Sequence, residues 1–263
     1  MRSTYPSNTS IQSDIAGCLA LILLKKKHLF LHHQKANNVG DIYCNPAMHF
    51  SFKSYRNVPY TTNVSSASSL TFAGGNVFDE ARRFTARSKQ STFGHRIAWG
   101  IGLPAPGRRD DQIQNFADSC ELFSTRDFNW KARFHFVPCA SCMSRDFDQQ
   151  HPERHERVFF FHKSKTKPEL LASADGPVMH NTKRKLSEVL RFLSSGRTVI
   201  TNSYHGVYWA HLLGKRTICI PFGEKFRTYR QLPTFAADGD WQAALRKAAV
   251  FSSDLEEYRS INT

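Results

Sequence analysis

Residues 198–221 read TVITNSYHGVYWAHLLGKRTICIP and contain a complete β-loop-α-β unit. From the amino end they predict a buried β-branched strand, a polar turn, a short helix closed by a glycine and a second strand, at residues 198–201, 202–206, 207–214 and 217–220. Strands joined in this way are parallel, and the loop lies at the carboxyl edge of the sheet, where α/β proteins bind ligands. His205 lies in this loop beside a helix N-terminus, so we expect it to bind an anion and to move a proton.

The rest of the chain repeats the alternation of strand and helix. Further apolar runs predict strands, each followed by a polar or glycine turn, at residues 28–33, 69–73, 96–100, 122–125 and 158–162. Helices are predicted to begin at about residue 42 and to cover residues 78–83, residues 181–194 and parts of 238–258. In the helix at 181–194, Leu186, Val189, Leu190 and Leu193 lie on one face. This order predicts an α/β fold whose loops gather at one edge of each sheet.

The length of 263 residues allows two small domains or one large one. Residues 143–156 are polar and charged and contain a proline, which predicts a linker between two domains. Residues 1–14 are rich in Ser, Thr and Asn, and we expect a disordered leader there. The two domains are therefore expected at residues 15–142 and 157–263.

The formal net charge of +14 favours an anionic partner, such as a phosphate ester, an acidic glycan, an anionic lipid surface or nucleic acid. A solvated basic surface is the alternative, and charge alone does not separate the two. The longest apolar run, residues 15–24, is about half of what a helix needs to cross a bilayer. Three lysines follow it, and no basic region precedes it, so a secretory signal is not predicted. We expect a cytoplasmic protein with peripheral contact at the inner membrane.

The six cysteines lie mostly in apolar segments, which predicts reduced thiols in the core: Cys18, Cys44, Cys120, Cys139, Cys142 and Cys219. Cys139 and Cys142 have the spacing of a metal-ligand pair, but no second pair or close histidine pair completes a zinc site. A structural turn is the prediction for this segment, and no metal is expected.

Two turns that follow predicted strands supply candidate binding residues. Asn38, Gly40 and Asp41 suit either hydroxyl binding or a helix cap. Gly74 and Gly75 suit either backbone amides that face an anion or tight packing. The residues alone leave these alternatives open.

Cationic side chains follow two other predicted strands. Arg126 comes directly after residues 122–125, where a guanidinium can bind a carboxylate or a phosphate at two points. Lys163 and Lys165 suit anion binding or a solvated loop. By contrast, His211 lies on an apolar helix, which predicts a structural histidine.

Five motifs taken in order resemble the bacterial polysaccharide pyruvyl transferases: NNVGD after the first strand, AGGNVFDEA, IAWGIGLP, STRD and the stretch at 199–221. The resemblance covers most of residues 28–222. It implies two Rossmann-like domains that face a cleft, as in GT-B glycosyltransferases. It also implies transfer of a pyruvyl group from phosphoenolpyruvate to sugar hydroxyls of a cell-surface polysaccharide precursor, as in exopolysaccharide biosynthesis.

The resemblance also suggests roles for residues. Arg126 matches the family arginine that contacts the donor, and His205 matches the histidine proposed as the general acid. The remaining candidates for substrate binding are Asn38, Gly40, Asp41, Gly74, Gly75, Asn202, Ser203, Lys163 and Lys165.

Two departures from the family pattern stand out. Many members have Arg-Leu-His where this chain has Ser203-Tyr204-His205, so one donor-binding arginine is missing. The candidates to replace its charge are Lys163, Lys165, Lys215 and Arg216. Residues 137–142, VPCASC, stand where many members have a Gly-Asp-Pro turn.

The hypothesis is a ketal pyruvyl transfer without a metal or other cofactor. His205 protonates the methylene carbon of phosphoenolpyruvate, and Arg126 with nearby lysines holds its phosphate and carboxylate. The expected acceptor is a lipid-linked oligosaccharide or polysaccharide precursor. The alternatives are a GT-B glycosyltransferase that uses a nucleotide sugar and a noncatalytic polyanion-binding protein. The chain has no nucleic-acid-binding signature, so nucleic acid is not the expected partner.

Overall fold

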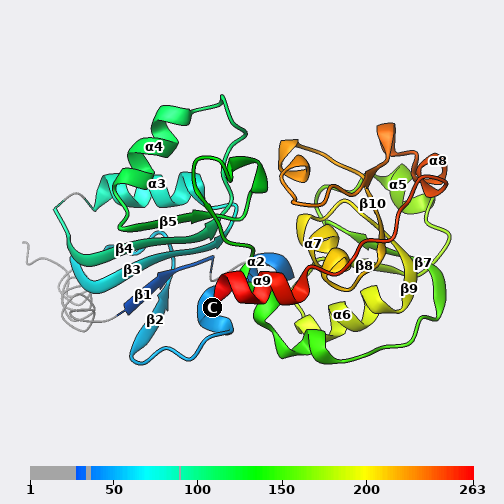
Figure 1. Cartoon of the computed structure of the whole chain (residues 1–263), viewed down its shortest axis with the longest axis horizontal. Coiled ribbons are helices and arrows are strands. Elements are labelled where there is room, and N and C mark those ends of the chain that lie inside the picture. Colours follow the sequence, from blue (N-terminus) through cyan, green and yellow to red (C-terminus); the bar gives the residue numbers. More distant parts are fainter. Residues whose placement is uncertain (1–27, 34–36, 89) are drawn as a thin grey trace, which may run out of the picture.

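The computed structural model describes residues 28–33, 37–88 and 90–263 and divides them between two β-sheets (Figure 1). Within these residues, six strands form the first sheet in the order β2-β1-β3-β4-β5-β6, and five form the second in the order β11-β10-β9-β7-β8. All neighbouring strands of both sheets run parallel. The chain therefore has the expected α/β fold of two Rossmann-like domains in a GT-B-like arrangement. The expected leader and the apolar run at 15–24 lie outside the described residues.

The first domain follows the predicted alternation of strands and helices. Its strands are β1 (His28–Leu31), β2 (Tyr55–Val58), β3 (Ser66–Gly75), β4 (Thr92–Ile101), β5 (Leu122–Thr125) and β6 (His135–Phe136). Its helices are α2 (Val39–Tyr43), α3 (Phe78–Arg87) and α4 (Asp110–Asp118), with the short 3-10 helices η1 (Pro46–Met48) and η2 (Phe128–Trp130). Two further 3-10 helices, η3 (Ala140–Met143) and η4 (Arg145–Asp148), follow β6 and pack against the core of the second domain. The sequence analysis did not predict β2, β6 and α4, because the two strands are short edge strands and α4 has few apolar residues.

The core of the first domain lies between the sheet and the helices α3 and α4. Phe72 from β3 packs against Phe84 of α3 and Phe116 of α4, with ring centroids 6.1 and 5.1 Å apart. On the opposite face, Phe30 of β1 packs against Phe52 at 4.8 Å. Since side chains alternate along a strand, the central strands bury residues on both faces, which is typical of parallel sheets.

The second domain contains the strands β7 (His155–Phe161), β8 (Val178–His180), β9 (Gly196–Thr201), β10 (Arg216–Cys219) and β11 (Thr234–Phe235). Its helices are α5 (Pro168–Ala172), α6 (Leu186–Ser194), α7 (Tyr204–Leu212), α8 (Trp241–Leu245) and α9 (Leu255–Asn262), with the 3-10 helices η5 (Glu224–Arg227) and η6 (Ala237–Gly239). The pairing of β9 with β10 is parallel, as the β-loop-α-β unit predicted.

Three consecutive phenylalanines of β7 show how the second core is built. Phe160 faces the cluster formed with α6 and α7, whereas Phe159 and Phe161 face the cluster that contains Trp241 of α8. The predicted apolar face of α6 is confirmed, because Leu186, Val189, Leu190 and Leu193 are all buried. The sheet is thus covered on both faces by helices.

Three helices begin at residues other than those expected, and side-chain caps explain two of them. Helix α2 begins at Val39 because the Asn38 side chain accepts a hydrogen bond from the Gly40 amide. Helix α7 begins at Tyr204 because the Ser203 side chain accepts from the Gly206 amide. The third, α6, begins at Leu186, since β8 occupies residues 178–180. His205 therefore lies in the first helical turn of α7 rather than in a loop before it.

The two domains meet along the carboxyl edges of their sheets. The Asn181 carbonyl, which follows β8, accepts a hydrogen bond from the Val39 amide at 2.9 Å. Its side chain donates to Asn38 Oδ1 at 3.1 Å and accepts from the Lys163 amide at 2.9 Å. Helix α9 also returns to the first domain (Figure 1), where Asn262 accepts a hydrogen bond from the indole of Trp99. These contacts fix the two sheets relative to each other.

The cysteines of the described residues are free thiols, and four of them are buried: Cys44, Cys139, Cys142 and Cys219. Cys18 lies outside the described residues. Among the helices that the structure describes, none has the length and apolar character needed to span a bilayer.

Replacing Asn181 with alanine tests the contact between the domains. The change removes two hydrogen bonds of a buried side chain, one from the Lys163 amide and one to Asn38 Oδ1, so we expect the free energy of unfolding to fall by about 1–3 kcal/mol. Chemical denaturation measures this loss. Gln112→Ala, which removes an exposed hydrogen bond on α4, is the control, and an equal effect of the two changes would contradict the assignment.

Candidate functional site

His205 lies at the contact between the two domains, in the first turn of α7. Its side chain is 5% exposed, and its Nδ1 faces the backbone of Gly40 in α2. A Cβ atom at residue 40 would lie 2.0 Å from Nδ1, which no real contact permits. Gly40 is therefore the residue that lets the imidazole reach the first domain.

Residues 139–142 hold α7 in place. Tyr208 donates its hydroxyl hydrogen to the Cys139 carbonyl at 2.8 Å, and the Trp209 indole donates to the Ser141 hydroxyl at 3.0 Å. Cys139 Sγ also lies 3.5 Å from His205 Nε2. The segment acts as a structural turn, as the sequence analysis expected. No cluster of His, Cys, Asp or Glu in the part of the chain that the structure describes has the geometry of a metal site.

Arg126 follows β5 and is 5% exposed. Its guanidinium carbon lies 4.0 Å from the ring centroid of Tyr204, the residue beside His205. Gly102 makes room for it, because a Cβ there would lie 3.1 Å from Nη2 and 3.2 Å from Nε. The Nε and Nη1 atoms are buried and have no hydrogen-bond partner among the described residues. A guanidinium stays protonated in proteins, so the site contains a buried cation with free donors.

The adjacent acid, Asp127, does not use its carboxylate for Arg126. One oxygen accepts a hydrogen bond from the Leu103 amide at 2.6 Å, and the other accepts from the Thr228 hydroxyl at 2.7 Å. Burial raises the pKa of Asp127, while the charge of Arg126 opposes that rise. The carboxylate thus ties β5 to the second domain and leaves the donors of Arg126 free.

A second cation, Lys225 in η5, lies near Arg126 and was not identified from the sequence. Burial, together with the positive charge of Arg126, lowers the pKa of Lys225 to about 8. Its Nζ lies 4.8 Å from the ring centroid of Phe222. No motif marks Lys225, because it stands in a charged loop after β10 and reaches the site only in the folded chain.

His205 is influenced by the same two cations. Burial lowers its pKa well below the ordinary value, and the charges of Arg126 and Lys225 lower it further. The imidazole is therefore neutral at pH 7 when the site holds no anion. An anion bound to Arg126 and Lys225 would offset their charge and raise the pKa of His205.

The structure brings part of the expected site together around α2. Asn38 caps this helix and donates from its amide to Asp41 at 2.9 Å. The charge of Asp41 raises the pKa of Lys225, so the two side chains lie close enough to interact. The cap alternative for Asn38 is confirmed, whereas hydroxyl binding by Asn38, Gly40 and Asp41 stays a prediction.

Asn202 and Ser203 already use their side chains within the second domain. Asn202 Oδ1 accepts from the His162 amide at 2.7 Å, and its Nδ2 donates to the Thr166 hydroxyl at 3.0 Å. Ser203 caps α7. These bonds account for both residues, and substrate binding by them stays a prediction.

The glycine pair at the end of β3 packs against α2. A Cβ at Gly74, which has φ +29°, would lie 2.0 Å from the Cys44 carbonyl oxygen, and one at Gly75 would lie 3.2 Å from Cys44 Sγ. Packing and turn geometry therefore explain both glycines, and anion binding by them stays a prediction.

The lysines expected to supply the missing charge lie in different places. Lys163 and Lys165 are exposed in the loop after β7, and the charge of Lys165 acts on Lys225. Lys215 pairs with Glu153 at 2.7 Å, and Arg216 begins β10. Both lie at the amino end of that strand, whereas the site lies at the carboxyl end. Lys215 and Arg216 are thus wrong candidates, because a strand separates them from Arg126.

His211 is buried on α7 with its ring centroid 4.1 Å from that of Phe251. Burial lowers its pKa to about 3, so it stays neutral. The buried, apolar environment of His211 supports its expected structural role.

The structure is that of a two-domain α/β protein in which the buried Arg126 and His205 lie where the domains meet, with Lys225 close enough to influence both. The family model "Polysaccharide pyruvyl transferase" matches residues 20–223, and the chain belongs to that family. It is thereby a transferase that acts on polysaccharide.

One of the solved structures that are similar to this chain supports the fold. A crystal structure of an uncharacterised protein from Klebsiella pneumoniae has 16% sequence identity and a TM-score of 0.52, with 88% of this chain and 100% of that chain covered. A putative UDP-N-acetylglucosamine 2-epimerase from Listeria monocytogenes has 10% identity and a TM-score of 0.49, with 90% and 89% covered. A search among curated proteins finds no match.

Replacing Gly40 with alanine tests the close approach of His205. The added methyl group must displace the imidazole, so we expect a loss of about 1–3 kcal/mol in unfolding free energy and a large loss of turnover. Gly223→Ala is the matched control, because a Cβ there meets nothing within 4 Å and the backbone is extended. Equal unfolding midpoints for the two variants would contradict the contact.

The pKa of Lys225 predicts a pH dependence of anion binding. Lys225 is protonated below about pH 8 and neutral above it, so the dissociation constant for phosphoenolpyruvate should rise as the pH increases through that value. Isothermal titration across this range measures the effect. In Lys225→Met, binding should be weaker and this rise should disappear, whereas Lys185→Met, at the exposed lysine that precedes α6, should behave as the wild type. If the dissociation constant still rises with pH in Lys225→Met, another titrating group is responsible for the rise.

Proposed function

We propose that the protein transfers a pyruvyl group from phosphoenolpyruvate to two hydroxyls of a cell-surface polysaccharide precursor and forms a cyclic ketal. The observation that carries this proposal is the buried guanidinium of Arg126, whose Nε and Nη1 have no partner among the described residues. An unpaired buried charge is costly, and a bound anion removes that cost. Family membership makes the pyruvyl donor the first candidate for this anion.

Phosphoenolpyruvate carries a carboxylate and a phosphate close together, which suits two cations in one cleft. Arg126 would bind one group in a bidentate manner, and Lys225 would bind the other as a point charge. Lys225 would thereby supply the charge that the family places at the position of Ser203. Together the two cations would stabilise the phosphate as it leaves.

The reaction balances without an additional reagent. A proton is added to the methylene carbon, which becomes the methyl group, and one sugar hydroxyl forms a bond to the central carbon. The bond from that carbon to the phosphate oxygen then breaks, and a second hydroxyl closes the ketal. Of the two hydroxyl protons released, one replaces the proton given to the methylene carbon and the other goes to phosphate.

His205 is the proposed donor of the proton to the methylene carbon. Its pKa is depressed in the anion-free site by burial, Arg126 and Lys225. Binding of the anionic donor would offset the two charges and allow the imidazole to take up a proton, so protonation is coupled to substrate binding. The scheme uses side chains and substrate alone and calls for no cofactor.

The acceptor is proposed to be a lipid-linked oligosaccharide or polysaccharide precursor at the cytoplasmic face of the inner membrane. The net charge of +14 would favour peripheral contact with anionic lipids there.

A nucleotide-sugar glycosyltransferase is the second candidate, and one cavity favours it. A cavity of about 1020 Å³ lies at the carboxyl edge of the second sheet, where Phe222, Lys165 and Arg227 contribute to its lining. An aromatic ring with nearby cations suits a nucleotide. This cavity also contains Glu169, Asp238 and Asp240, whose charges oppose a diphosphate, so pyruvyl transfer remains the better supported function.

Thermal unfolding with different ligands tests the proposal. Phosphoenolpyruvate should raise the melting temperature of the wild type, because a ligand of the folded state stabilises it by mass action. Arg126→Gln should abolish this shift, and His205→Ala should retain most of it while losing turnover, measured as phosphate release with a glycan acceptor. Stabilisation by a nucleotide sugar alone would favour the glycosyltransferase, and stabilisation by any polyanion at low salt only would favour noncatalytic binding.

Full turnover in His205→Ala with intact donor binding would overturn the role of the histidine. The melting temperatures of the two variants without ligand show whether either change has disturbed the fold.

A further inference from the structure

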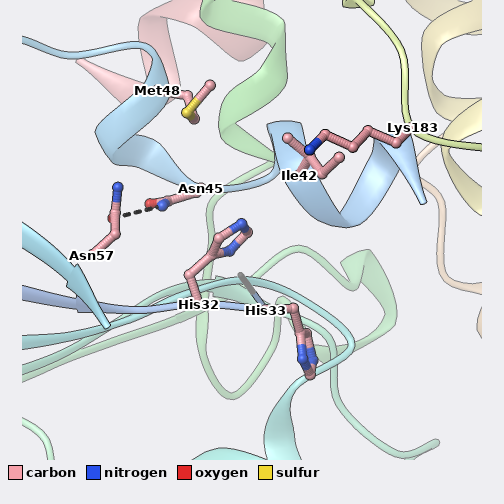
Figure 2. A pocket seen from close by; sticks show the side chains of 7 residues that line it. All are labelled: His32, His33, Ile42, Asn45, Met48, Asn57 and Lys183. Carbon is pink, nitrogen blue, oxygen red and sulfur yellow. Dashed lines mark hydrogen bonds between the residues drawn. The ribbon is translucent and has the colours of Figure 1, made fainter. Parts of the chain in front are cut away.

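A separate cavity of about 360 Å³ opens at the carboxyl ends of β1 and β2 (Figure 2). The first domain contributes most of its lining, and the second domain contributes one lysine: His32, His33, Ile42, Asn45, Met48, Asn57 and Lys183. The backbone amide of Lys183 donates to Asn37 Oδ1 at 3.1 Å, so this segment of the second domain is anchored at the cavity. The cavity therefore depends on both domains.

The short helix α2 separates this cavity from His205. Gly40 faces the imidazole of His205, and Ile42 lines the cavity. Positions i and i+2 of an α-helix, such as residues 40 and 42, face directions that differ by roughly 200°. Helix α2 thus has the cavity on one side and His205 on the other.

His32 gives the cavity an unsatisfied polar group. Its side chain is 7% exposed, and its Nδ1 is buried without a hydrogen-bond partner among the described residues. Burial lowers the pKa of His32 to about 4, with His33 adding to the effect, so the ring is neutral at pH 7. Figure 2 shows the ring pointing between Asn45 and Ile42. A ligand hydroxyl there would remove the cost of the unpaired nitrogen.

The rest of the lining offers neutral hydrogen-bonding groups beside apolar ones. The Asn45 amide donates to Asn57 Oδ1 at 2.8 Å (Figure 2), and Asn45 Oδ1 accepts from the Ala47 amide, which fixes both side chains. Ile42 and Met48 supply apolar surface, and Lys183 is the one cation among the seven lining residues that the structure describes. Hydroxyl groups with a carbon-rich face suit this combination better than a phosphate does.

We propose that this cavity binds a sugar residue of the acceptor glycan other than the one that receives the pyruvyl group. The identification of the glycan as the acceptor rests on the proposed function. His32 would hydrogen-bond a ring hydroxyl through Nδ1, and Met48 and Ile42 would contact the carbon face of the ring. The cavity would thereby select glycans by a sugar that takes no part in the chemistry.

Binding of monosaccharides to the full chain, without phosphoenolpyruvate, tests this inference. The probes are methyl glucoside, methyl galactoside, N-acetylglucosamine and glucuronic acid, followed by saturation-transfer NMR and titration up to tens of millimolar. At least one should bind, and His32→Leu should weaken it by about tenfold or more, as expected for a lost buried hydrogen bond. Met48→Trp, which fills the cavity from its exposed rim, should block binding while leaving the core unchanged.

His211→Leu is the matched control, because His211 is also 7% exposed with an unpartnered Nε2 but does not line this cavity. Its sugar affinity should stay within about twofold of the wild type, which a lost hydrogen bond would exceed. No binding of any probe, or equal effects of His32→Leu and His211→Leu, would overturn the inference. Unaltered binding in Met48→Trp would overturn it as well.

The outcome is separable from that of the proposed function. Phosphoenolpyruvate binding should be lost in Arg126→Gln and retained in His32→Leu. If phosphoenolpyruvate binds and is transferred but no sugar depends on His32, the cavity assignment fails and the proposed function stands. If sugars bind through His32 but phosphoenolpyruvate does not bind, the proposed function fails and a saccharide cavity remains.

Discussion

The buried guanidinium of Arg126 is the constraint around which the cleft is organised. A desolvated cation without an acceptor is unfavourable, and the neighbouring Asp127 gives its oxygens to Leu103 and Thr228 instead. The same charge depresses the pKa values of Lys225 and His205. An anionic ligand would offset all of these effects at once, and its binding would then be coupled to the protonation of Lys225 and His205.

Close approaches that only glycine permits bring these charged groups together. Gly102 lets the guanidinium lie against the end of β4, and Gly40 lets the imidazole of His205 reach α2. Helix α2 then has a role on each side, since it faces His205 on one side and the His32 cavity on the other. A five-residue helix between the domains thus relates the proposed donor site to the proposed saccharide cavity.

The structure gives a physical reason for Ser203, which stands where many family members have an arginine. A serine at this position caps α7 and thereby orients His205, whereas an arginine could not make that cap. Lys225 of η5, which lies near enough to Arg126 for the two charges to interact, is the proposed replacement for the missing positive charge. A lysine with a lowered pKa differs from an arginine in one respect, because its charge depends on pH near neutrality. Donor affinity in this chain is therefore expected to depend on pH.

Short sequence patterns predicted those elements whose structure depends on residues close together in the chain. The β-branched run at 198–201, the apolar face of α6 and the strand at 122–125 were predictable because burial and hydrogen bonding impose a fixed period on each element. The side-chain cap at Ser203 was not recognised in the sequence, so α7 was predicted to begin three residues later than it does. The position of Arg126 directly after β5 also followed from the sequence, whereas His205 lies in the first turn of α7 and not in the predicted loop. Lys225, Asn181 and the cavity at His32 did not follow from the sequence, because each depends on contacts between segments far apart in the chain, and only the tertiary structure decides which strand ends meet.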